Sequence, residues 1–172
     1  LCSGVIKICS NDQAFAALKE DGSVITWGTD YCGGDSSSVA PELSSGVTEI
    51  FSSRGSFAAL KNDGSVVTWG YSDGGGDSSS VATELSSGVT EIFSTKSSSQ
   101  FYNSGSNIPD AAFAALKEDG SVITWGGDYR GGDSSSVATE LSIGVTEIFS
   151  TKGAFAALKN DGSVVTWGQS SN

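Results

Sequence analysis

The stretch FAALKNDGSVVTWG, residues 57–70, decides the fold of this chain because it occurs four times with only small changes. Two short apolar runs on either side of an Asp-Gly pair are the strongest short-range signal for a β-hairpin. Glycine at the turn supplies the positive φ angle that such a tight turn needs. The four turn glycines are Gly22, Gly64, Gly120 and Gly162, and the four hairpins end at Trp27, Trp69, Trp125 and Trp167.

A second marker shows that the repeated unit is longer than the hairpin. The pattern Gly-Val-x-x-Ile begins at residues 4, 46, 88 and 144, which are 42, 42 and 56 residues apart, whereas the tryptophans are 42, 56 and 42 apart. Both markers therefore place 14 extra residues, 97–110, inside the third unit. The chain reads as one repeat domain, 1–172, with units at approximately 1–42, 43–84, 85–140 and 141–172.

Each unit is predicted to contain three short strands and a connector. In the second unit, residues 47–52 are rich in β-branched and aromatic residues, which is typical of strands, and the hairpin follows. The connector, 74–88, begins with glycines; Asp77 or Ser78 can cap one or two helical turns there, although an ordered loop fits equally well. The paired alanines at the hairpin centre indicate a closely packed neighbouring sheet, so we expect an all-β array of stacked units.

These motifs resemble the repeat of the regulator of chromosome condensation family. The resemblance rests on Gly-Val-x-x-Ile, on the hairpin that ends in Trp-Gly, and on the following Gly-Gly-Asp, and it covers nearly the whole chain outside residues 97–110. The short 42-residue period is similar to that of repeat proteins in dinoflagellate algae. The resemblance implies a β-propeller-like fold, either a partial ring or part of a longer repeat protein, used mostly for protein–protein contacts.

The composition excludes several classes of function. The net charge is −11, and the isoelectric point of about 4.1 does not suit binding to a phosphate backbone. The chain has no histidine, the commonest general base and metal ligand, and no apolar run of the ~18 residues that a membrane span needs. The Asp-Gly turns lack the ligand spacing of calcium loops. We therefore expect no enzymatic activity, no cofactor, no metal and no nucleic-acid partner.

The best candidate for a partner contact is the insertion, because binding residues favour loops on rigid scaffolds. Phe101, Tyr102 and Ile108 are its apolar side chains, and a drifted loop without a role explains the segment equally well. The tryptophans could stack sugars or sense light, but their identical place in every unit favours a repeated core contact. Cys9 replaces a phenylalanine of the other units and is expected to be buried, whereas Cys32 lies in a connector and is expected to be exposed.

Three hypotheses about function remain. The first is a non-catalytic scaffold that binds other protein subunits. The second is a peripheral subunit of a large organellar assembly such as an algal photosystem–antenna complex in the plastid, associated with the membrane through protein contacts. The third, implied only by the family resemblance, is guanine-nucleotide exchange.

Overall fold

The computed structural model describes residues 3–95 and 110–169, and within them the regular secondary structure consists of β-strands and 3₁₀ turns. Each unit forms one antiparallel three-stranded sheet whose strands follow the chain order. The strands are β1 (Val5–Ser10), β2 (Ala14–Lys19) and β3 (Val24–Gly28); β4 (Val47–Ser52), β5 (Ser56–Lys61) and β6 (Val66–Gly70); β7 (Val89–Ser94), β8 (Ala112–Lys117) and β9 (Val122–Gly126); β10 (Val145–Ser150), β11 (Ala154–Lys159) and β12 (Val164–Gly168). The predicted three strands per unit are confirmed.

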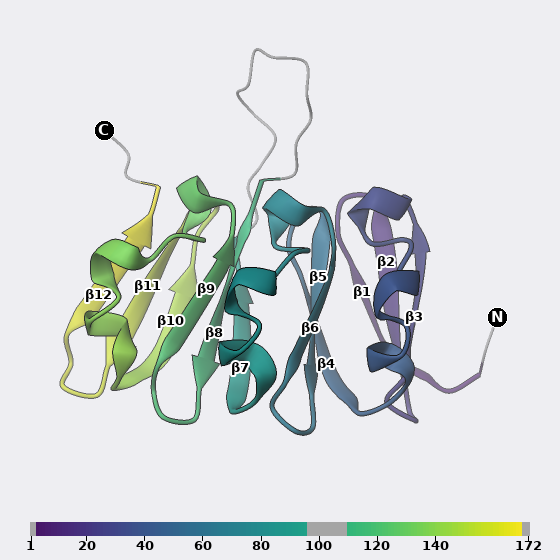
Figure 1. The fold of residues 1–172 in the computed structure, drawn as a ribbon, viewed down its shortest axis with the longest axis horizontal. Coiled ribbons are helices and arrows are strands. Elements are labelled where there is room, and N and C mark those ends of the chain that lie inside the picture. Colours follow the sequence, from purple (N-terminus) through teal and green to yellow (C-terminus); the bar gives the residue numbers. More distant parts are fainter. Residues whose placement is uncertain (1–2, 96–109, 170–172) are drawn as a thin grey trace, which may run out of the picture.

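The four sheets stand in a row, and the first and last sheets lie at opposite ends of it (Figure 1). The first strands of the units, β1, β4, β7 and β10, neighbour one another along one side of the row. Nothing joins the first sheet to the last within the described residues, so the array is open rather than a closed ring.

Three apolar layers between consecutive sheets form the core. In the first layer, Ala14 and Ala16 of β2 pack against Phe57 and Ala59 of β5, and all four side chains are at most 1% exposed. The other two layers repeat this arrangement. The small alanine side chains allow the sheets to approach closely, as the sequence predicted, because a larger side chain would not fit.

Within each sheet, a phenylalanine and the hairpin tryptophan lie opposite each other on neighbouring strands. Phe57 pairs with Trp69, and their rings stack with centroids 5.3 Å apart, as do the equivalent rings of the other units. The core position predicted for the tryptophans is confirmed for Trp69, Trp125 and Trp167, which are at most 6% exposed. Trp27 differs, because within the described residues no sheet packs on its face of the first sheet, and 42% of its surface is exposed.

The connectors contain three 3₁₀ turns each rather than a longer helix. Within the described residues these are η1 (Asp30–Cys32), η2 (Ser37–Val39) and η3 (Glu42–Ser44); η4 (Ser72–Gly74), η5 (Ser79–Val81) and η6 (Glu84–Ser86); η7 (Asp128–Arg130), η8 (Ser135–Val137) and η9 (Glu140–Ser142). Each connector packs on the third strand of the next unit. The predicted helix cap takes a different form, because the Asp77 carboxylate accepts the Ser79 N–H at 2.9 Å.

The structure corrects the prediction for one cysteine. Cys32 is fully buried in the first apolar layer, because the connector turn folds back toward the next sheet rather than projecting into solvent. Burial raises the pKa of its thiol. Cys9 was predicted to be buried and is only partly so: it packs against the edge of the same layer, and its Sγ donates to the carbonyl of Ile50 at 3.3 Å.

Candidate interaction surface

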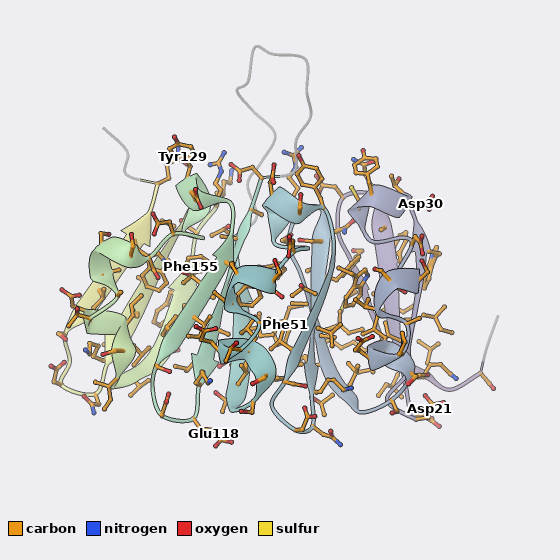
Figure 2. All side chains as sticks on the ribbon, in the orientation of Figure 1. Asp21, Asp30, Phe51, Glu118, Tyr129 and Phe155 are labelled. Atoms are coloured by element: carbon orange, nitrogen blue, oxygen red, sulfur yellow. The ribbon has the colours of Figure 1, made fainter. Side chains whose placement is uncertain are left out.

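Two sets of loops meet at one end of the row of sheets. The first set joins the first and second strands of each unit, and the second set is the opening turn of each connector. Hydrogen bonds tie them together: Asn11 Nδ2 donates to the Cys32 carbonyl at 2.7 Å, and Ser53 Oγ donates to the Gly74 carbonyl at 2.9 Å. Asp30 and Tyr129 mark this end in Figure 2, whereas Asp21 and Glu118 mark the opposite end.

These loops are the places where the repeats differ from one another. The strand-joining loops read Asn-Asp-Gln at 11–13, Ser-Arg-Gly at 53–55 and Thr-Lys-Gly at 151–153, and the third unit carries its insertion there. The connector openings also differ, whereas the next eight connector residues, GGDSSSVA, are identical in three units. Loops that vary on a uniform scaffold are where binding residues concentrate. We call this end, formed by residues 11–13, 29–32, 53–55, 71–74, 95, 110–111, 127–130 and 151–153, the variable end.

Exposed tyrosines are the most conspicuous side chains of the variable end. Tyr129 is 82% exposed and Tyr31 is 55% exposed, and the Tyr31 hydroxyl donates to Gln13 Oε1 at 3.1 Å. Tyr71 is half-buried; burial and the negative charge of Asp73 raise the pKa of its phenol. Neutral tyrosines offer an apolar ring and a hydrogen-bonding tip, the combination enriched in protein interfaces.

Two arginines tie neighbouring loops of the variable end together. Arg54 of the second unit contacts Asp12 of the first, with Nε and Oδ2 2.9 Å apart. Arg130 contacts Asp110 at 3.1 Å, and its Nη1 donates to Gln169 at 2.6 Å. Both arginine side chains are at most 14% exposed, so they hold the loops in place while the tyrosines face solvent.

The described residues on either side of the insertion, Thr95 and Asp110, lie at the variable end. Thr95, the last described residue before it, is buried, and its hydroxyl accepts the Ala112 N–H at 2.9 Å. The predicted contact residues Phe101, Tyr102 and Ile108 lie outside the described residues. Tyr31, Tyr129, Arg54 and Arg130 were not among the contact residues predicted from the sequence. Arg54 and Arg130 depart from the residues of the other units at their positions, which was the available signal, whereas Tyr31 and Tyr129 share one repeat position, where the second unit has Asp73.

The opposite end of the row is uniform and consists of the four hairpin turns. Each turn aspartate accepts two hydrogen bonds from the serine two residues later: Asp63 Oδ1 lies 3.0 Å from Ser65 N and 2.6 Å from Ser65 Oγ. These bonds lower the pKa of the aspartates, to about 2 for Asp21. Turn geometry therefore accounts for the Asp-Gly-Ser motif, and residues 3–95 and 110–169 contain no group of three or more potential metal ligands.

A groove of about 820 Å³ runs along the first strands of the units. Its lining includes Phe51 and Phe93, serines at the strand ends, and Lys7 and Lys152. Two of its serine hydroxyls are already engaged, because Ser52 Oγ donates to the Ser10 carbonyl at 2.9 Å and Ser94 Oγ to the Ser52 carbonyl at 2.8 Å. No helix in the described part of the chain is long and apolar enough to cross a membrane.

No protein-family model and no curated protein sequence matches the chain. Solved structures do match. Prp20p from Saccharomyces cerevisiae, in a study of its binding to Gsp1p and histones, has a TM-score of 0.57 at 16% identity and covers 95% of this chain. The same yeast protein, named RCC1 (Prp20) and bound to Kap60, gives a TM-score of 0.57 at 13% identity over 98% of the chain. Human WBSCR16 gives 0.53 at 17% identity over 98%.

These likenesses show the fold. The chain has the architecture of RCC1-type propeller repeats, which confirms the predicted fold class and the resemblance of its repeats. It spans less than half the length of these proteins: 44% of the two yeast chains and 48% of the human chain. Four sheets in an open row agree with a partial ring.

Proposed function

We propose that this chain is a protein-interaction module and that its partner binds at the variable end. The observation that carries the proposal is the contrast between the two ends of the row. One end repeats the same turn four times. The other end presents different loops with exposed tyrosines, and largely buried arginines join neighbouring loops there. The yeast neighbour bound to Kap60 supports a role in binding proteins. We expect no catalytic activity.

The test compares three forms of the chain as bait in affinity capture from its source, with quantitative mass spectrometry. The forms are the wild type, the double variant Tyr31→Ala/Tyr129→Ala, and the control Glu20→Ala/Glu118→Ala at the opposite end. Truncating a tyrosine that is an interface hot spot costs about 2 kcal/mol, or roughly 30-fold in affinity. We expect a protein that the wild type and the control retain and that the tyrosine variant loses.

Two results would contradict the proposal. In one, the tyrosine variant retains the same proteins as the wild type; in the other, the control loses them as well. Circular dichroism of each variant checks that the fold is intact. Both tyrosines are exposed, so their truncation is expected to change stability by less than about 0.5 kcal/mol.

As the setting of this interaction we propose a large organellar assembly, because the repeats resemble those of dinoflagellate algal proteins. In that case the chain would be a peripheral subunit of an algal photosystem–antenna complex, held to the membrane by protein contacts. Mass spectrometry of purified plastid complexes tests this proposal, and absence of the chain from plastid fractions would exclude it.

Guanine-nucleotide exchange is the second candidate activity. It is supported by the yeast neighbour Prp20p, which was studied for its binding to Gsp1p, and by the family resemblance. The test measures release of a fluorescent guanine nucleotide from small GTPases. Release at the uncatalysed rate would remove this candidate and would leave the interaction proposal standing.

A further inference from the structure

The open row of sheets ends in two exposed apolar faces. The head face belongs to the first sheet and the tail face to the last. On the head face, Ile8 is 60% exposed, Phe15 43% and Ile25 37%, whereas the equivalent residues of the other units pack against the preceding sheet. The members of the head face are Ile8, Phe15, Ile25 and Trp27, and those of the tail face are Phe149, Ala154, Ala156, Leu158 and Val164.

The three internal junctions show what these faces accept. At each of them, the alanine face of one sheet packs on the phenylalanine–tryptophan face of the next. The tail face carries the alanine side of this pair and the head face carries the aromatic side. We propose that two copies of this chain associate head to tail, the tail face of each on the head face of the other, and close a ring of eight sheets.

Charges along the first strands favour this junction. Lys7 of the first sheet contacts Glu49 at the equivalent position of the second, with Nζ and Oε1 2.7 Å apart. The third and fourth sheets carry Glu91 and Glu147 at that position. Only the first sheet has a lysine there. A head-to-tail junction therefore places Glu147 beside Lys7 of the second copy, whereas a glutamate in place of that lysine would repel Glu147.

The variable end gives a second, independent match of charge. Asp12 of the first unit and Arg54 of the second face each other across an internal junction, and Lys152 occupies this loop position in the fourth unit. At the head-to-tail junction, Lys152 therefore faces Asp12 of the second copy. Opposite charges meet at both edges of the proposed interface.

The hairpin turn of the fourth unit also has room for a neighbour. A Cβ atom on Gly22, Gly64 or Gly120 would lie within 2.8 Å of the backbone nitrogen of the glycine that opens the next sheet. A Cβ atom on Gly162 would have nothing within 4 Å. In the proposed junction this space receives Gly4 of the second copy, the residue equivalent to Gly46, Gly88 and Gly144.

Two copies are the number that the comparisons favour. One copy spans 44–48% of the length of the propeller-type chains whose fold it shares, so two copies together approach one whole chain of that type. A head-to-tail interface closes into a ring when the rotation between copies permits it and otherwise grows into a filament.

Sedimentation and light scattering of the 172-residue chain over a range of concentrations test the proposal. We expect a reversible equilibrium between the 17.5-kDa chain and twice that mass. The variant Ile25→Arg places a charge in the head face and is expected to abolish the dimer. Its control, Ile143→Arg, changes a residue that is 66% exposed outside both faces, and the dimer should persist.

A second pair of variants tests the charge match. Glu147→Lys sets two lysines against each other at the junction and should weaken dimerisation by roughly 10-fold. Glu91→Lys makes the same change of charge inside the row and should leave the dimer dissociation constant within about 2-fold of the wild-type value. Circular dichroism and thermal melting check that each variant is folded. A chain that is monomeric at all concentrations, a dimer that survives Ile25→Arg, or growth beyond two copies would overturn the proposal.

Discussion

Glycine performs two separate tasks at the hairpin turns of this protein. Gly22, Gly64, Gly120 and Gly162 all adopt φ angles between +74° and +82°, which L-residues avoid. The first three also lie so close to the next sheet that there is no room for a side chain; a Cβ on Gly64 would be 2.6 Å from Gly88 N. Gly162 has the same backbone conformation and no such neighbour. The chain therefore contains a matched pair that separates conformational strain from steric exclusion.

At concentrations at which the chain is monomeric, we expect Gly162→Ala to lower the free energy of unfolding by about 1–2 kcal/mol, the cost of the left-handed conformation alone. Gly64→Ala should lower it by at least about twice as much, because the junction with the next sheet must open as well. Chemical denaturation of both variants measures the difference. Equal losses would show that the close approach at Gly64 has no energetic consequence.

At the scale of elements, the connector of each unit packs on the next sheet and accepts a hydrogen bond from its tryptophan. The indole N–H of Trp125 donates to the Gly75 carbonyl of the preceding connector at 3.0 Å, and Trp69 and Trp167 make the same bond to Gly33 and Gly131. A single glycine carbonyl thus satisfies a buried donor in each junction. Such buried groups are costly to leave without a partner.

Replacing this tryptophan tests the coupling between connector and sheet. Trp125→Phe leaves the Gly75 carbonyl without its indole partner and removes part of a buried ring, so it should cost about 2–4 kcal/mol of unfolding free energy. Trp27→Phe, at the exposed head face, should cost less than about 1 kcal/mol. Urea denaturation of the two variants gives the comparison, and similar losses would contradict the assigned role of the connector.

At the scale of the whole molecule, stability is the sum of similar units and of the junctions between them. The acidic side chains that contribute to the charge of −11 include a repeated set of turn and connector aspartates. Hydrogen bonds from serine lower the pKa of Asp21, Asp35, Asp63, Asp77, Asp119, Asp133 and Asp161. Because folding favours the ionised form of each, these groups stabilise the protein above the ordinary aspartate pKa of 3.8.

This stabilisation should disappear as the pH falls from about 4 toward 2, the folded-state pKa of Asp21. We expect Asp21→Ala to lower the melting temperature at pH 6 and to converge with the wild type near pH 2. Glu20→Ala removes one charge from the same turn but leaves the aspartate–serine bonds in place. Melting curves from pH 2 to 7 compare the three proteins, and a constant gap between Asp21→Ala and the wild type would rule out the linkage.

The sequence by itself determined the unit of this protein. An Asp-Gly turn between two apolar runs specifies a hairpin through contacts a few residues apart, and a regular spacing of such hairpins specifies a stack of similar sheets. The same local reasoning explains why the turn aspartates and glycines, and the core position of three tryptophans, could be predicted.

Only the tertiary structure decided what depends on a neighbouring unit. Four tryptophans with the same local sequence differ in burial because three follow a sheet and Trp27 does not. Cys32 is buried because its connector folds onto the next unit, and Tyr31 and Tyr129 share one end because the strand-joining loops and the connector openings meet there. These properties arise from the packing of segments about 40 residues apart, and no short stretch of the chain carries them.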